Sequence, residues 1–172
     1  KEHFDSGPHK AGMGKTGALA CASCHRNHRV QRPTIALVEP ACRECHPQDS
    51  PAFGMGQTVK ALFAGVRDTL ALAEMAAAEA SALGVNVQRP RETLREARTG
   101  FMRAQLVWHG LQMDKIEGAA EQAAYTARKA LAQVSELLTS RRLRRIGLGV
   151  AWAVILTNVV LLYLKKRQVD RM

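Results

Sequence analysis

This chain of 172 residues has few aromatic residues and no proline in most of its C-terminal half, and both features bear on its fold. Aromatics make up 5% of the residues although 47% are hydrophobic, and much of the hydrophobic fraction is alanine. A thick globular core needs more large side chains, so this composition predicts long helices that pack through small residues. No proline follows Pro90, so the rest of the chain lacks the strongest helix breaker. We therefore expect a mainly α fold.

Acidic residues are almost absent from residues 141–172, which carry eight basic residues and one acidic residue. The whole chain has a formal net charge of +10, a value that suggests nucleic-acid binding when it is spread over one surface. Here most of the excess flanks an uncharged segment, residues 146–164. Basic residues in that position meet lipid head groups. The charge distribution therefore argues against a nucleic-acid partner.

The uncharged segment 146–164 is long enough to cross a bilayer, since it would form roughly 28 Å of helix at about 1.5 Å per residue. We predict one C-terminal transmembrane helix within an anchor that covers residues 141–172. A buried core helix is the alternative, but a chain of this size has little core in which to bury it. Basic residues lie near both ends of the segment, so the positive-inside rule does not orient it.

Residues 57–140 show helical periodicity in two stretches. The first runs from about Gln57 to Leu83 and is followed by Gly84, a natural terminator. The second starts near Arg91 and reaches about Ser140. The short connection predicts an antiparallel helical hairpin whose second helix projects past the first. We expect its alanine-rich faces to pack against other subunits.

All four cysteines fall in two C-x-x-C-H motifs, Cys21-Ala-Ser-Cys24-His25 and Cys42-Arg-Glu-Cys45-His46. In such a motif the two thiols bond the vinyl groups of one porphyrin, and the following histidine ligates its iron. The motifs predict two covalently attached haem c groups, with His25 and His46 as the proximal ligands. The attaching cysteines would be Cys21, Cys24, Cys42 and Cys45.

Three other roles would account for the two C-x-x-C pairs but not for the histidine that follows each pair. The spacing of the two pairs is that of a zinc ribbon, in which four thiolates close a structural site. Paired cysteines also occur as redox motifs and as structural disulfides. None of these three requires a histidine directly after the second cysteine of each pair.

Each haem iron has a second axial position, and an imidazole there gives a saturated centre suited to electron transfer. His28 is too close to His25 to reach the opposite face of the same haem. We therefore assign His28 to the second haem and His9 to the first. His3 and His109 are further candidate ligands, and His109 lies on an apolar helical stripe where packing is the alternative role. Methionine ligation would fall to Met13 or Met55.

Residues 1–56 resemble the multihaem cytochromes c that carry doubled C-x-x-C-H motifs. That family places Ser-x-x-His or Gly-Pro-His upstream of a haem motif and a further histidine just after it. Ser6 to His9 and Cys21 to His28 match this usage, and Cys42 to His46 supplies a second haem. The resemblance implies bis-histidine, low-potential haems stacked closely together. Membrane-anchored quinol dehydrogenases of this kind carry an N-terminal anchor, so their quinol chemistry is not carried over to a chain with a C-terminal anchor.

These observations predict a loop-rich dihaem module in residues 1–56, a helical hairpin in 57–140 and a membrane anchor in 141–172. We expect an electron-transfer protein of the bacterial inner membrane, not itself an enzyme, with a periplasmic haem module and a cytoplasmic C-terminus. Its partners would be other membrane subunits and other cytochromes. The alternatives are the C-terminal part of a larger multihaem reductase and a zinc-ribbon membrane scaffold. The chain begins at Lys1 without an initiator methionine, which fits a processed chain or part of a longer one.

Overall fold

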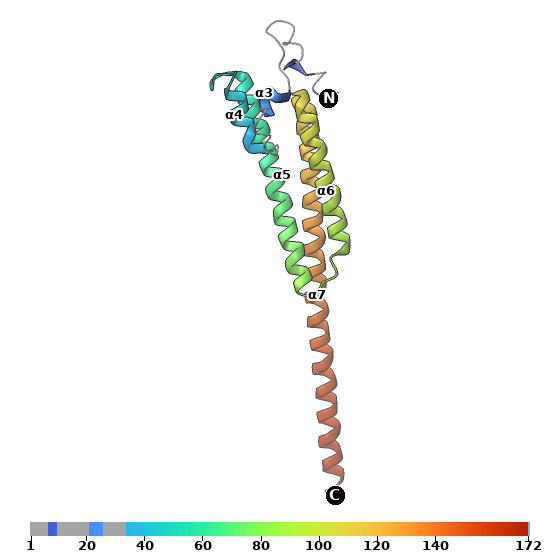
Figure 1. Ribbon diagram of the computed structural model, residues 1–172. Coiled ribbons are helices and arrows are strands. Elements are labelled where there is room, and N and C mark those ends of the chain that lie inside the picture. The colour runs from blue at the N-terminus through green and yellow to red at the C-terminus, as the bar shows by residue number, and fades with distance from the viewer. Residues whose placement is uncertain (1–6, 10–20, 26–33, 172) are drawn as a thin grey trace.

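The computed structural model describes residues 7–9, 21–25 and 34–171, and its regular elements are all helical. No strand occurs in those ranges, and the predicted mainly α fold is confirmed. The short helices α3 (Cys21–His25) and α4 (Val38–Arg43), with the 3-10 helix η1 (Ile35–Leu37), lie at one end of three long helices (Figure 1).

The first long helix, α5, runs from Pro51 to Ala82 and therefore begins before the expected Gln57. Ser50 explains the earlier start, because its hydroxyl oxygen accepts a hydrogen bond from the backbone N–H of Phe53 at 3.2 Å. Pro51 then occupies the first turn, where its missing N–H removes no helical hydrogen bond. Gly84 follows the helix with φ 75°, the left-handed conformation that glycine adopts at a helix end.

The helix expected from Arg91 to Ser140 is instead two antiparallel helices. They are α6 (Gln88–Val107) and α7 (Met113–Val169), joined by the 3-10 helix η2 (Trp108–Gly110). Leu111 after η2 has φ 49°, which reverses the chain in the left-handed region. The prediction of one continuous helix was wrong at this point, because no proline marks the turn and the apolar periodicity continues through Trp108 and Leu111.

The three long helices form a bundle in which α7 packs against both α5 and α6. Its core consists mostly of alanine and other small residues: Val59, Val66, Ala73, Ala77 and Ala80 on α5, Ala97 and Ala104 on α6, and Ala120, Ala123, Ala127, Ala130 and Val134 on α7. Phe63 and Phe101 add an edge-to-face ring pair with centroids 5.6 Å apart. Small side chains let the helix backbones approach closely. The alanine-rich faces, which we expected to meet other subunits, meet each other within the chain.

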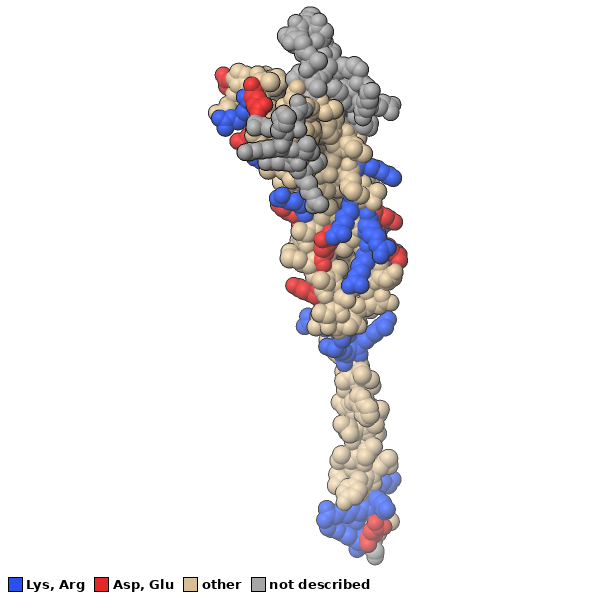
Figure 2. Space-filling view, in the orientation of Figure 1, with Lys and Arg blue, Asp and Glu red and all other residues tan. Residues whose placement is uncertain are grey.

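Helix α7 continues beyond the bundle as a single rod (Figure 1). It is long and apolar enough to cross a membrane, and none of its apolar window is buried, so it is not a core helix. Basic side chains lie at both ends of the uncharged stretch of this rod (Figure 2). The span thus leaves the bundle at the end opposite to α3 and α4.

Candidate functional site

The first C-x-x-C-H motif is a helix in its own right, since α3 comprises Cys21 to His25 and nothing else. Helical spacing places positions three and four residues apart on one side of the turn, so both thiols and the imidazole share a side. Cys21 and Cys24 are exposed and His25 is half-buried. The motif therefore presents two thiols and one imidazole together.

The second motif forms a comparable turn at the end of α4. The backbone N–H groups of Cys45 and His46 both donate to the carbonyl of Cys42, at 3.3 and 2.9 Å. Helix α4 packs on α5, where Glu39 forms an ion pair with Lys60. A Cβ at Gly56 would lie 3.1 Å from Cys42 Sγ, so this glycine allows the motif to sit directly on the helix.

The two motifs lie side by side, because α3 contacts α4. The four cysteines are free thiols. Cys24 is exposed as a residue, but desolvation of its thiol by the surrounding chain, followed by the nearby Cys45, raises the thiol pKa. Cys42 is half-buried, and desolvation followed by Cys24 raises its pKa. Redox C-x-x-C motifs instead depend on a lowered thiol pKa. Cys24 and Cys42 therefore lack the lowered pKa of a redox-active thiol.

The imidazole of His46 faces that of His9, with ring centroids 6.1 Å apart and an angle of 33° between the ring planes. Both side chains are half-buried. Burial, and then the neighbouring His46, lowers the pKa of His9, which favours the neutral imidazole that binds metals. His9 was predicted to serve the first motif, and the structure places it beside the second.

The imidazole of His25 lies close to that of His109, with centroids 6.2 Å apart and an interplanar angle of 28°. His109 belongs to η2, the turn between α6 and α7, so the reversal that the sequence did not predict carries it to this end of the bundle. Its Nδ1 lies 3.3 Å from the carbonyl oxygen of Leu106. If Nδ1–H donates there, Nε2 is left available, the arrangement common among metal-binding histidines.

Gly7 holds the segment with His9 against the same turn. A Cβ at Gly7 would lie 3.1 Å from the carbonyl oxygen of Gly110 and 3.2 Å from that of His109. A larger residue would push the segment away from η2. The bundle turn thus supplies His109 directly and positions His9 indirectly.

The two histidine pairs fit the spacing of ligands on a single iron. A histidine nitrogen binds a metal at about 2 Å and lies about 1.1 Å from its ring centre, so two imidazoles on opposite faces of one iron have ring centres about 6.2 Å apart. Ordinary ring contacts span about 4.5–7 Å. What distinguishes these two pairs is that each contains the histidine of a C-x-x-C-H motif.

Several candidate ligands lie outside the described residues, namely His3, His28 and Met13. Met55 is half-buried on α5. From the sequence, His109 was a weak candidate because a lone histidine on an apolar helix face is more often a packed residue. Gly110 directly after it was the available signal of a helix end, which would have brought it to the end of the bundle.

Within the described ranges, no group of three or more His, Cys, Asp or Glu side chains is placed to hold a metal ion. A tetrahedral zinc site needs four such ligands, whereas a haem iron takes two from the protein. No protein-family profile, curated protein or solved structure matches the chain.

Proposed function

We propose that the protein is a membrane-anchored dihaem c-type cytochrome that carries electrons on the outer side of the cytoplasmic membrane. The observation that carries this proposal is the pairing of each motif histidine with a second imidazole, at 6.2 Å for His25 and 6.1 Å for His46. The separations lie within the range of ordinary ring contacts, so the support comes from the presence of a C-x-x-C-H histidine in each pair.

The pairing assigns the residues that would hold each haem. Cys21 and Cys24 would attach the first, with His25 and His109 as its axial ligands. The second would be attached by Cys42 and Cys45, with His46 and His9 as its axial ligands. Each haem would supply a one-electron couple, and the two histidines paired at its motif would hold its iron. A filled coordination sphere leaves no site for a substrate, so a carrier role is favoured over catalysis.

The membrane helix and the haem chemistry together suggest the topology. Covalent haem attachment takes place outside the cytoplasm, so the haem end would be periplasmic and residues 165–172 cytoplasmic. The electron-exchange partners would be other membrane subunits or other cytochromes. The protein would serve as a subunit of a respiratory or photosynthetic complex.

Two alternatives have some support. The sequence spacing of the two C-x-x-C pairs suits a zinc ribbon in a membrane scaffold, although the described thiols are not grouped to hold a metal ion. The multihaem resemblance suits a piece of a larger reductase, in which another haem performs the chemistry. The first predicts a colourless protein, and the second predicts an iron with an open site.

The test is a visible spectrum of the full chain, produced with a cytochrome c maturation system, before and after dithionite, with a pyridine haemochrome count. We expect two covalent haems per chain and low-spin bands only. Absence of a Soret band together with stoichiometric zinc would overturn the proposal in favour of the scaffold. A high-spin component would contradict the saturated carrier and favour the reductase.

A further inference from the structure

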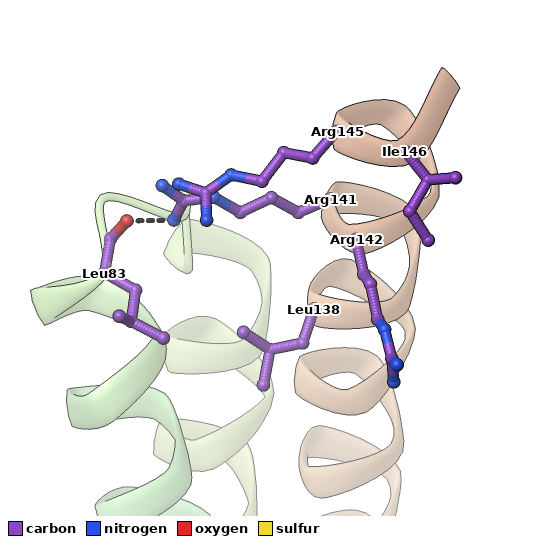
Figure 3. Close-up of a pocket in the computed structure, with 6 residues that line it drawn as sticks. All are labelled: Leu83, Leu138, Arg141, Arg142, Arg145 and Ile146. Atoms are coloured by element: carbon purple, nitrogen blue, oxygen red, sulfur yellow. Dashed lines mark hydrogen bonds between the residues drawn. The ribbon is translucent and has the colours of Figure 1, made fainter. Parts of the chain in front are cut away.

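A pocket of about 240 Å³ lies where α7 leaves the bundle, far from the cysteines (Figure 3). It is lined by the apolar side chains of Leu83, Leu138 and Ile146 and by the arginines Arg141, Arg142 and Arg145. Leu83 ends α5, and the other five residues belong to α7. The pocket therefore joins the base of the bundle to the start of the span.

The arginines of this pocket lack acidic partners. Arg141 donates a hydrogen bond from Nη1 to the carbonyl oxygen of Leu83, and Arg145 extends beside it (Figure 3). Among the described residues no carboxylate forms an ion pair with Arg141, Arg142 or Arg145, and the chain has no acidic residue between Glu136 and Asp170. Two like charges four residues apart on a helix repel each other, so an anion between Arg141 and Arg145 would stabilise them.

The apolar part of the pocket also lacks a cover. Leu83 is 59% exposed and Ile146 is 55% exposed. Ile146 is the first residue of the uncharged segment, which places the arginines at the depth of the lipid head groups once the span is in a bilayer. An amphiphile with a phosphate above and hydrocarbon below matches both parts of the pocket.

We propose that this pocket binds the head group of an anionic phospholipid. Arg141 and Arg145 contact its phosphate, and Leu83, Leu138 and Ile146 contact the glycerol and the first part of the acyl chains. The bound lipid holds the base of the bundle at the membrane surface. This site depends on insertion of α7 into a membrane and not on the haems.

The experiment measures lipid binding to the purified full chain in a neutral detergent by native mass spectrometry. Phosphatidylglycerol, phosphatidylcholine and soluble glycerol phosphate serve as the three probes. We expect phosphatidylglycerol to bind about tenfold or more tightly than phosphatidylcholine, since each basic residue near a membrane surface contributes measurably to anionic-lipid affinity. Glycerol phosphate should bind weakly, because it lacks the hydrocarbon that covers the leucines.

Two double variants separate the pocket from the general charge of the anchor. R141Q/R145Q should lose the preference for phosphatidylglycerol over phosphatidylcholine. K165Q/K166Q, which removes two basic residues at the other end of the span, should keep it. L138W retains every arginine and should weaken phosphatidylglycerol binding several-fold by filling the apolar side. Helix content by circular dichroism and the visible spectrum verify that each variant is folded.

Equal affinity for the two lipids, or equal losses in both double variants, would overturn the proposal. Binding of glycerol phosphate as tightly as phosphatidylglycerol would show a site for free phosphate and not for a lipid. An absence of haem with the lipid preference intact would refute the cytochrome proposal alone.

Discussion

The membrane-distal end and the bundle below it are built on different principles. The bundle is stabilised by its own buried core, in which residues such as Ala73, Ala97 and Ala127 are fully buried. The described part of the distal end has short helices, of which α3 buries no residue, and α4 buries only Val38. A segment with so little buried apolar surface needs another source of stability, which covalent haem would supply. The bundle provides a scaffold, and the distal end carries the cysteines and histidines of the two C-x-x-C-H motifs.

Removing a haem attachment should have the largest effect and should separate the two regions. In C21A/C24A we expect the haemochrome count to fall from two haems to one, because both thioether bonds of the first haem are lost. The far-UV circular dichroism of the bundle should change little, since its core contains neither cysteine. A22S in the same motif is the control and should retain both haems. Collapse of the bundle in the double variant would show that the two regions are not independent.

The next largest effect is expected from removing His109, the proposed ligand that lies on the bundle turn. H109A should leave the first haem with one axial imidazole, so that about half of the low-spin signal converts to high-spin in electron paramagnetic resonance. Added imidazole should restore the low-spin signal. The exposed control R103Q should behave like the wild type. An unchanged spectrum in H109A would refute the pairing of His25 with His109.

A larger side chain in the bundle core should destabilise the bundle without changing the distal end. A127L adds three carbons at a fully buried position on α7 and should lower the free energy of unfolding by about 1–3 kcal/mol. Chemical denaturation followed by circular dichroism measures this change, and the visible spectrum in native buffer should stay the same. A132L, at an exposed position on the same helix, should cost far less. Equal costs at the two positions would contradict the packing described for the core.

Gly56 marks the contact between the regions and can be compared with Gly54 on the same helix. Nothing lies within 4 Å of a Cβ at Gly54, so G54A should stabilise α5 by about 0.5–1 kcal/mol through helix propensity. In G56A the new methyl meets Cys42 Sγ at 3.1 Å, a contact tight enough that one of the two groups must shift. We expect this contact to cancel the gain in the free energy of unfolding in G56A, as measured by chemical denaturation. A gain as large as that of G54A would show that α4 moves freely over α5.

The smallest effect concerns the ion pair of Glu39 with Lys60. The hydrogen bond from Lys60, followed by its charge, lowers the pKa of Glu39. A lowered folded-state pKa contributes stability above the unfolded-state pKa, and this contribution disappears as the pH falls through the folded-state value. In K60M the Glu39 pKa, followed by nuclear magnetic resonance, should rise toward its ordinary value. K129M on α7 should leave it unchanged, and an equal rise in both variants would contradict a specific pair.

The sequence predicts the parts of this molecule that depend on short-range pattern. The mainly α fold, the apolar segment 146–164 and the end of α5 near Gly84 follow from composition, charge and periodicity. The pairing of the histidines does not, because it depends on where the chain reverses. Leu111 has no sequence property that demands a left-handed conformation, yet its reversal decides that His109 lies beside His25. His9 was assigned to the first motif only because His28 was given to the second, and the 36 residues between His9 and His46 carry no signal of their proximity.

Helix α7 is unbroken from the turn that carries His109 to the far side of the span. From Met113 to Arg141 it rises about 42 Å at about 1.5 Å per residue, so insertion of the uncharged segment in a bilayer would hold the histidine end at that height above the lipid head groups. Membrane helices tilt by about 20° on average, and a rigid rod tilted by that angle carries its top roughly 15 Å sideways. A change in the tilt of an inserted α7 would therefore become a large lateral displacement of the histidine end.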